Sequence, residues 1–398
     1  MNGLSDQSKA TPRVMIVAGE ASGDLHGAAL YQALQQRLTS LDCIAMGGVA
    51  MRDTGVSIIV DSTDMGVIGV WDAITHYFPI RQAFSQVEKN LQTFSPDLLI
   101  CIDYKEFNFR VAKRAKALGI KVLFYVSPQV WAWRPGRVKK YGEVIDMMAV
   151  IFPFETVFYQ KYAIPVRYVG HPLTQVVTVS CGKQQAIQDA GLNATFPIIG
   201  LLPGSRLTEI KRLLPVLLDA AEFLKEAYPH AQFVLPKAKT FNDQELQAYL
   251  QNSSVDVHLC ESGDYNLLQS CDIAISASGT ATLELALLSI PTVIVYKVAP
   301  LTYWLAKWLV RVPTIGLPNI IAGKKIVPEL IQDQANPKGI FKQVCNILND
   351  NHAVDKMRVS LSQVAGSLGE NDGIAELAKL AIEMLPEANK THSNVKGG

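Results

Sequence analysis

The sequence has no pattern typical of a disulfide framework, a zinc site or a membrane span. Its strongest candidate for a spanning segment, residues 285–296, is shorter than the roughly 20 apolar residues that a bilayer requires, and Pro291 interrupts it. Its cysteines form no Cys-x-x-Cys pair, a pattern typical of reduced thiols in a cytoplasm. They are scattered along the 398 residues at Cys43, Cys101, Cys181, Cys260, Cys271 and Cys345.

An excess of charge of either sign is also absent. There are 37 Lys and Arg against 36 Asp and Glu, which gives a formal net charge of +1. Nucleic-acid partners are not expected, because coating a nucleic acid requires a net basic field. Residues 1–13 lack the apolar core of a signal peptide and are predicted to form a disordered tail, and residues 386–398 a polar one. The 49% of apolar residues excludes a mostly disordered protein.

Short β-rich runs alternate with longer stretches of helical composition along the whole chain. Continuous apolar strands separated by helices predict parallel sheets with helices on both faces. Eleven strands are too many for one ordinary sheet, so we expect an α/β fold with two doubly wound, Rossmann-like domains that face an interdomain cleft. The expected strands are Val14–Val17, Cys43–Met46, Leu98–Ile102, Val122–Val126, Met148–Phe152, Val166–Val169, Ile198–Leu202, Gln232–Leu235, Val255–Leu259, Ile273–Ser276 and Thr292–Tyr296.

The first glycine-rich loop, Gly19–Gly27, follows the first strand. Its spacing is G-x-x-x-G-x-x-x-G and not G-x-G-x-x-G, so a nicotinamide site is poorly supported. Glu20 and Asp24 would also repel a pyrophosphate. We therefore expect Glu20, Ser22, Gly23 and Asp24 to contact a sugar, and a helix start without a ligand is the alternative interpretation.

A second loop, residues 202–206, ends the first strand of the second half. Gly204 and Ser205 expose backbone donors in a tight turn, and the guanidinium of Arg206 can form a bidentate contact with phosphate. The alternative is a helix cap followed by solvated basic residues.

A third loop, residues 276–284, gives the sharper signal. Ser278, Gly279 and Thr280 are small enough to let a diphosphate reach a helix N-terminus, whose dipole favours anions. Glu284 beyond them can accept two hydrogen bonds from a ribose diol. Thr282 and Glu284 could instead be ordinary capping residues.

Asp103 is the candidate general base, because it ends the expected strand Leu98–Ile102 and so lies at the ligand edge of the sheet. An ordinary turn-forming Asp is the alternative. Ser127 and His26 do not indicate a hydrolase, since no G-x-S-x-G turn is present. His171 lies at the expected domain junction and is interpreted as structural in preference to catalytic.

Two stretches, residues 131–140 and 301–311, combine Trp with nearby Lys or Arg. Indole rings beside cations suit an interface of acyl chains and anionic head groups. A core helix with a solvated basic edge is the alternative interpretation. The residues expected to contact a membrane or acyl chains are Trp131, Trp133, Arg134, Trp304 and Trp308.

Taken together, the loops resemble lipid-A-disaccharide synthases, which are inverting glycosyltransferases of the GT-B architecture. The resemblance extends from about Val14 to about Leu380. Seven motifs carry it in order: Gly-Glu-Ala-Ser-Gly-Asp (19–24), Asp103 with Phe107-Asn108, Tyr-Val-Ser-Pro-Gln-Val-Trp-Ala-Trp-Arg (125–134), Pro-Phe-Glu (153–155), Leu-Pro-Gly-Ser-Arg (202–206), Ala-Ser-Gly-Thr-Ala-Thr-Leu-Glu (277–284) and Leu-Pro-Asn-Ile-Ile-Ala-Gly (317–323).

The resemblance implies an enzyme that joins UDP-2,3-diacylglucosamine to 2,3-diacylglucosamine 1-phosphate (lipid X), giving the β-1′,6-linked lipid A disaccharide 1-phosphate and UDP. It implies an acceptor-binding domain at residues 14–170 that carries Asp103, and a UDP-sugar-binding domain at residues 171–360. Terminal helices at residues 361–385 are expected to pack back across the domains. Asn319 matches a family position tied to activity, although it could equally be a turn residue.

Both implied substrates are anionic amphiphiles. We therefore expect a cytoplasmic enzyme that associates peripherally with the inner leaflet of the inner membrane. No cofactor and no metal are expected, because backbone amides and Arg206 can neutralise a diphosphate. A homodimer is left open.

One residue departs from the family pattern. Lys105 stands where the family usually has Pro, so it either alters the loop after Asp103 or adds a cation for the acceptor phosphate. Two other functions stay open: another GT-B enzyme that uses UDP-N-acetylglucosamine (a transferase or a 2-epimerase), and a catalytically inactive, membrane-associated nucleotide-sugar binder.

Overall fold

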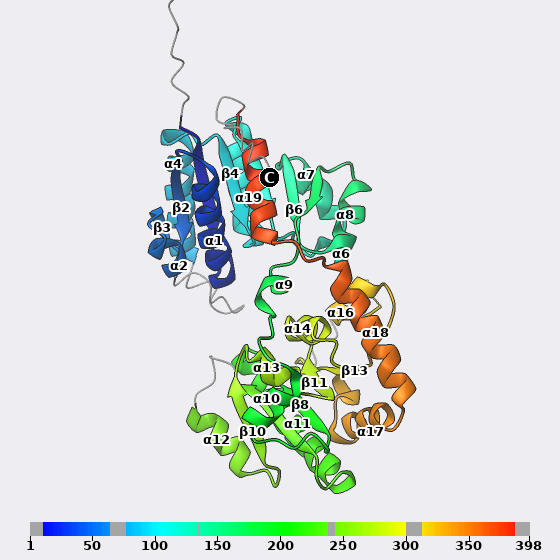
Figure 1. Ribbon diagram of the computed structural model, residues 1–398. Coiled ribbons are helices and arrows are strands. Elements are labelled where there is room, and N and C mark those ends of the chain that lie inside the picture. The colour runs from blue at the N-terminus through cyan, green and yellow to red at the C-terminus, as the bar shows by residue number, and fades with distance from the viewer. Residues whose placement is uncertain (1–10, 64–76, 134, 238–242, 300–312, 387–398) are drawn as a thin grey trace, which may run out of the picture. The chain divides into compact units, whose positions relative to one another are not determined.

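The structure is a computed structural model that describes residues 11–63, 77–133, 135–237, 243–299 and 313–386. The chain forms two compact units (Figure 1). Unit 1 comprises Met1–Pro172 and Asn371–Gly398, and unit 2 comprises Leu173–Glu370. Each unit is built around one parallel sheet.

The sheet of unit 1 has the order β3-β2-β1-β4-β5-β6-β7, and all its strand pairs are parallel. Each strand expected from the sequence in this half is present, and β3 is an additional one. The strands are β1 (Arg13–Ala18), β2 (Asp42–Gly47), β3 (Ser57–Asp61), β4 (Leu98–Ile102), β5 (Lys121–Tyr125), β6 (Met147–Val150) and β7 (Val166–Tyr168).

Helices cover both faces of this sheet, because alternate residues of its strands enter two different cores. Met15 and Val17 of β1 face one apolar cluster, and Val14 and Ile16 face the other. The helices of unit 1 are α1 (Ala21–Arg37), α2 (Val49–Asp53), α4 (Tyr77–Thr93), α5 (Lys105–Ala117), α6 (Val130–Trp133), the 3-10 turn η1 (Pro135–Arg137), α7 (Val138–Gly142), α8 (Pro153–Gln160) and α19 (Gly373–Met384).

Unit 2 repeats this plan with the order β10-β9-β8-β11-β12-β13. Its strands are β8 (Ile198–Leu202), β9 (Gln232–Lys237), β10 (Val257–Glu261), β11 (Ile273–Ala277), β12 (Thr292–Tyr296) and β13 (Glu329–Ile331), of which β13 was not expected. Its helices are α9 (Leu173–Val176), α10 (Lys183–Asp189), α11 (Leu207–Ala227), α12 (Asp243–Gln251), α13 (Tyr265–Leu268), α14 (Ala281–Leu287), α16 (Leu317–Ala322), the 3-10 turn η2 (Gln332–Gln334), α17 (Pro337–Leu348) and α18 (Asn351–Ser367).

The last two helices belong to different units. The boundary expected after residue 360 falls inside α18, which stays in unit 2 because it packs against α14, α16 and α17. The chain returns to unit 1 at Asn371. There α19 lies beside α1 (Figure 1). It buries four apolar side chains in the same core as α1, namely Leu377, Ala378, Leu380 and Ala381.

The strand order changes direction once in each sheet. In unit 1 this occurs between β1 and β4, and in unit 2 between β8 and β11. Ligands of doubly wound folds bind outside the carboxyl ends of the strands at such points. The loops after β1 and β4 contain Gly19–Gly27 and Asp103, and those after β8 and β11 contain residues 203–206 and 278–280. Four of the loops singled out in the sequence therefore lie at the two switch points.

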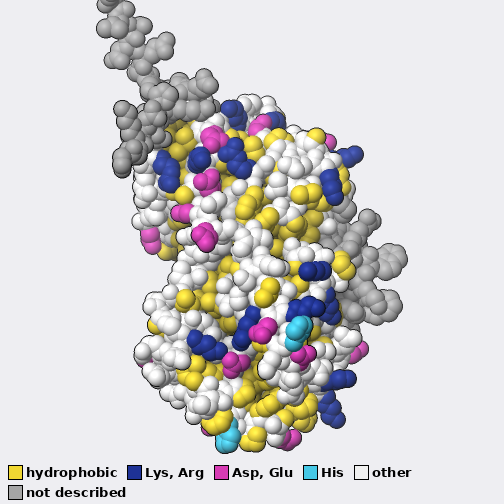
Figure 2. Space-filling view, turned by 45° about the vertical axis from the view of Figure 1, so that its right-hand side comes forward, with side chains coloured by type: hydrophobic (Ala, Val, Ile, Leu, Met, Phe, Trp, Pro, Cys, Tyr) yellow, Lys and Arg dark blue, Asp and Glu magenta, His cyan; other side chains and the backbone are white. Residues whose placement is uncertain are grey.

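The surface carries charges of both signs. Figure 2 shows Lys and Arg interspersed with Asp and Glu over the visible face, as the balanced composition requires. None of the helices in the described part of the chain is long and apolar enough to span a bilayer.

Candidate functional site

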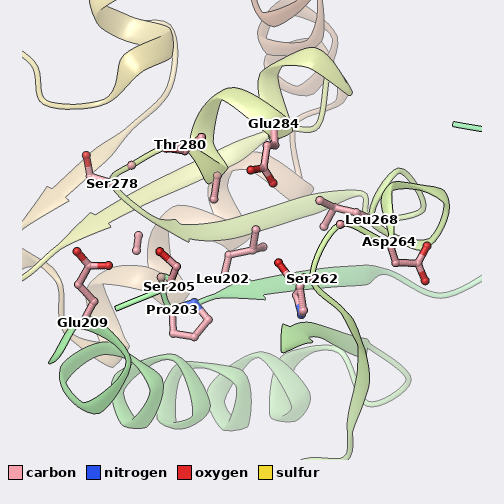
Figure 3. A pocket seen from close by; sticks show the side chains of 16 residues that line it. Leu202, Pro203, Ser205, Glu209, Ser262, Asp264, Leu268, Ser278, Thr280 and Glu284 are labelled. Atoms are coloured by element: carbon pink, nitrogen blue, oxygen red, sulfur yellow. The ribbon is translucent and has the colours of Figure 1, made fainter. Parts of the chain in front are cut away.

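A pocket lies at the switch point of unit 2 (Figure 3). It encloses about 770 Å³, part of it open to solvent, and is lined by residues 202–205, Glu209, residues 262–264 and residues 277–281 with Glu284. Its walls come from the loops after β8, β10 and β11, so three strand ends converge on one cavity.

The loop after β11 supplies one wall. Ser278 donates its hydroxyl to the carbonyl of Ile315 at 3.1 Å, and Gly279 and Thr280 border the cavity with their backbone. Glu284 projects from α14 into the pocket (Figure 3), and burial raises its pKa above the usual range. Thr282 is not part of this wall, because its buried hydroxyl donates to the carbonyl of Gly279 at 2.7 Å.

The loop after β8 supplies the opposite wall. Gly204 has a φ of +108°, and a Cβ there would lie 2.7 Å from Oε2 of Glu209, so this tight turn requires glycine. Arg206 precedes α11 and donates from Nη1 to Glu209 Oε1 at 3.0 Å. Its side chain is 81% exposed. Arg206 is not among the residues that line the cavity, but its guanidinium is bonded to Glu209, which is.

The third wall was missed in the sequence. Ser262, Gly263 and Asp264 line the pocket, and Asp264 also caps α13 by accepting from the amide of Leu267 at 2.9 Å. The signal was present, because this loop directly follows an expected strand, Val255–Leu259. It was overlooked because it contains no repeated glycines and no Lys or Arg.

Asp103 occupies a strained turn at the switch point of unit 1. Asp103 and Tyr104 have φ values of 48° and 45°, in the left-handed region that non-glycine residues rarely adopt. The buried amide of Asn108 holds this turn by donating to the carbonyls of Ile102 and Asp103 at 3.1 and 2.8 Å. Such strain clusters at functional sites, which fits a half-buried carboxylate presented at the sheet edge.

The loop after β1 packs against this turn. A Cβ on Gly19 would lie 2.2 Å from the ring of Tyr104, and one on Gly23 would lie 3.2 Å from Ala18. The imidazole of His26 lies nearby, where burial lowers its pKa and the charge of Asp103 opposes that shift. Of the residues expected to contact a sugar, Glu20 and Ser22 are exposed, and Gly23 is buried.

Asp24 has a structural role in this loop. Its buried carboxylate accepts from the amides of Gly48, Ala50 and Met51 at 2.7, 2.8 and 3.2 Å, which ties α1 to the start of α2. All three bonds reach one short segment, residues 48–51. They occupy three of the roughly four acceptor positions of the carboxylate.

Replacing Asp24 by Ala should therefore lower the stability of unit 1. We expect a loss of about 1.5–3 kcal/mol, the range for hydrogen bonds to a charged group. Urea unfolding followed by circular dichroism measures it, with the exposed Asp53→Ala as the control. An unchanged midpoint, together with a raised acceptor KM, would contradict the structural role.

A second buried acid, Glu155, connects three elements of unit 1. Its Oε1 accepts from the hydroxyl of Ser127 and from the indole N–H of Trp131, the latter at 3.1 Å, and its Oε2 accepts from the amide of Phe152 at 3.2 Å. Glu155 is 2% exposed, and burial raises its pKa to about 7. The carboxylate thus fixes the loop after β5 to the N-terminus of α8.

With the geometry of both units described, the relatives of the chain can be considered. Residues 14–381 match the family described as Lipid-A-disaccharide synthetase. The chain belongs to the lipid-A-disaccharide synthase family. A lipid-A-disaccharide synthase from Geobacter metallireducens is 45% identical over 373 residues, covering 94% of this chain and 97% of the relative. Another from Nitrosococcus oceani is 42% identical over 378 residues, covering 95% and 97%. The family predicted from the seven motifs is confirmed.

Solved structures support the fold of this synthase family member. A UDP-GlcNAc 2-epimerase from Neisseria meningitidis bound to UDP-GlcNAc has a TM-score of 0.63 at 14% identity, covering 93% of this chain and 100% of that one. The calicheamicin glycosyltransferase CalG4 has a TM-score of 0.59 at 13% identity, covering 94% and 98%. At these identities the likeness establishes the fold alone. The predicted GT-B class of the synthase is confirmed.

Asn319 lies in the buried interior of unit 2 of the synthase. Its amide nitrogen donates to the carbonyl of Val327 and to Glu329 Oε1 at 3.0 and 2.7 Å, and its oxygen accepts from the amides of Ile326 and Val327 at 2.7 and 3.0 Å. Glu329 also accepts from the amide of Gly316 at 2.9 Å. Asn319 therefore connects the start of α16 to β13, and its polar atoms are occupied by the protein.

Only part of the expected lipid-facing surface of the synthase can be located. Trp304, Trp308 and Arg134 lie outside the described residues, and for Trp133 the structure gives only the backbone, in α6. Trp131 is half-buried, with its ring 4.9 Å from that of Phe154 and its N–H bonded to Glu155.

Glu155 predicts a pH dependence of the stability of the synthase. Its pKa is about 7 in the fold against an ordinary value of 4.5, so the folded chain binds the extra proton between these values and stability falls as pH rises through them. Buried His171, whose pKa burial lowers from 6.5 to about 4, acts in the opposite sense, because its neutral form is favoured in the fold.

Replacing Glu155 by Gln isolates the first contribution, since His171 is common to both proteins. We expect the stability of the wild type relative to Glu155→Gln to fall by about 3 kcal/mol as pH rises from 4.5 to 7. Urea unfolding at three pH values within this window measures the difference. A difference independent of pH would contradict the buried, protonated carboxyl.

Proposed function

We propose that this chain transfers the diacylglucosamine unit of UDP-2,3-diacylglucosamine to the 6-hydroxyl of 2,3-diacylglucosamine 1-phosphate. The products are the β-1′,6-linked lipid A disaccharide 1-phosphate and UDP. The observation that carries the proposal is the pocket at the switch point of unit 2, in a chain of the lipid-A-disaccharide synthase family. A glycosyltransferase needs a site that holds the nucleoside diphosphate as it leaves.

The pocket supplies the groups that a nucleoside diphosphate requires. The backbone amides of Gly204, Gly279 and Thr280 would donate to the diphosphate, and the exposed Arg206 beside the pocket would contact it as charge develops on it. Glu284, aimed into the cavity, would accept hydrogen bonds from the ribose diol. The buried Thr282 would support this wall without touching the nucleotide.

Asp103 would act as the general base. Its carboxylate accepts the proton of the acceptor 6-hydroxyl while the hydroxyl oxygen forms a bond to the anomeric carbon of the donor. The bond from that carbon to the diphosphate oxygen breaks on the opposite face, and UDP departs with the electron pair. This single displacement inverts the anomeric configuration. The strained turn at residues 103–104 supports the assignment, because backbone strain of this kind is concentrated at functional sites.

The substrates also determine where the enzyme would work. Both are amphiphiles, so we propose a peripheral enzyme on the inner leaflet of the inner membrane that meets its lipids at the surface. Trp133, Arg134, Trp304 and Trp308 are the proposed lipid contacts. A homodimer is a further proposal, which light scattering of the purified protein tests.

One assay tests the proposed reaction. Purified full-length protein is mixed with both diacylated sugars in neutral detergent micelles, and UDP and disaccharide phosphate are quantified. We expect equal amounts of the two products. UDP-N-acetylglucosamine offered alone tests for 2-epimerisation, and conversion of that sugar without disaccharide formation would overturn the proposal. UDP binding without release of UDP would point to an inactive nucleotide-sugar binder.

A further inference from the structure

A second pocket lies in unit 1 beside the turn that carries Asp103. It encloses about 690 Å³, open to solvent, and has no role in the reaction as described above. Lys105, Glu106 and Arg137 give it its charge, and the buried residues Val130 and Tyr141 also line it. The pocket therefore combines charged and apolar lining residues.

The charges of this pocket leave one cation without a counter-ion. Arg137 binds both carboxylate oxygens of Glu106, with Nη2 and Oε2 2.9 Å apart, so these two charges cancel. Among the residues that the structure describes, Lys105 forms no ion pair. A guanidinium has five N–H donors, so Arg137 retains donors beyond the two that Glu106 takes. The pocket is thus complementary to an anion.

The short distance between this pocket and Asp103 fits the dimensions of the acceptor sugar. Lys105 follows Asp103 by two residues, so their Cα atoms are at most about 7.6 Å apart, the length of two peptide units. The hydroxyl of Tyr141 lies 3.4 Å from the carbonyl oxygen of Lys105, to which it donates, and this contact holds the start of α5 against the pocket. The acceptor carries its nucleophilic hydroxyl and its phosphate on one hexose ring, which spans a comparable distance.

We propose that this pocket binds the phosphate monoester of the acceptor glycolipid through Lys105 and Arg137, and so selects phosphorylated acceptors. The inference rests on the proposed function and adds a specificity site to it. When the phosphate binds Lys105, the sugar ring extends toward Asp103, where its free hydroxyl can lose a proton. Lys105 positions the acceptor and takes no part in the chemical step.

The test compares two acceptors, 2,3-diacylglucosamine 1-phosphate and the same lipid without phosphate, in neutral micelles with full-length protein. Lys105→Met should raise the KM for the phosphorylated acceptor by about 10- to 150-fold, the equivalent of one charge-assisted hydrogen bond. The KM values for the unphosphorylated acceptor and for the UDP-sugar donor should not change. Lys105→Arg should restore most of the discrimination, and Lys113→Met, an exposed lysine of the same helix, should behave as the wild type.

The outcomes separate the two proposals. Wild-type protein that makes no disaccharide from either acceptor refutes the proposed function and this assignment with it. If the wild type is active but Lys105→Met changes the KM of neither acceptor, or raises the KM values of both acceptors equally, only the phosphate site is refuted. Sedimentation with phosphatidylglycerol vesicles provides a third arm. If Lys105→Met loses vesicle binding while it retains acceptor discrimination, the pocket binds bilayer head groups and the assignment is wrong.

Discussion

Replacing Asp103 by Asn is expected to lower the turnover number by about 10²–10⁴-fold, the usual contribution of a positioned general base. The amide has the shape of the carboxylate but cannot accept the proton of the attacking hydroxyl. The affinity for UDP should not change, because the proposed nucleotide pocket belongs to unit 2. Steady-state kinetics and calorimetry with UDP measure the two quantities.

The control for this variant is Asp53→Asn, an exposed acid of the same unit that ends α2. It should leave both quantities at wild-type values. Near-normal turnover in Asp103→Asn would remove Asp103 from the mechanism. A fall in turnover accompanied by a lower unfolding midpoint would instead indicate that the strained turn had rearranged.

Replacing Arg206 by Ala is expected to lower kcat/KM by about 10²–10³-fold, the cost of removing one group that stabilises charge developing in the transition state. The exposed guanidinium contributes little to folding, since its partner Glu209 is the third residue along and exposed pairs add little stability. The loss should therefore appear in kinetics and in UDP affinity and not in the unfolding midpoint.

Arg212→Ala is the matched control, because Arg212 is an exposed arginine on α11, the helix that Arg206 precedes, and it forms no ion pair with a residue of the pocket wall among the described residues. It should retain wild-type kcat/KM. Equal losses in the two variants would show that the general positive charge of α11 matters and not the position of Arg206. Unchanged UDP affinity in Arg206→Ala would exclude that residue from the proposed nucleotide site.

The sequence predicted the architecture well because parallel strands leave a simple signal. A strand buried on both faces is a continuous apolar run, and eleven such runs correspond to strands of the two sheets. The two that were missed lie at sheet edges: Ser57–Asp61 has only one fully buried residue, and Glu329–Ile331 has only three residues. The other two edge strands, β7 and β10, have no buried residue and were nevertheless predicted, so the edge position alone does not explain the two misses.

The sequence predicted which loops form the candidate sites, but it did not predict where the polar side chains of these loops point. Loop positions follow from strand ends, which is why residues 203–206 and 278–284 were found. The direction of a polar side chain depends on neighbours that are remote in sequence. Asp24 accepts from amides 24 to 27 residues away, and Asn319 bonds to Glu329 on β13, 10 residues away, so neither contact could be derived from the local pattern. Glu155 lies in one of the seven motifs, but the motif does not show its hydrogen bond with Ser127, which is 28 residues away.

The return of the chain to unit 1 has a consequence for biosynthesis. The apolar face of α1 is covered by α19, which emerges from the ribosome only after the roughly 200 residues of Leu173–Glu370. At translation rates of about 5–20 residues per second, that face stays uncovered for about 10–40 seconds. Unit 2 is contiguous and can complete its fold first, so the nascent amino-terminal half is the part that we expect to need chaperone protection.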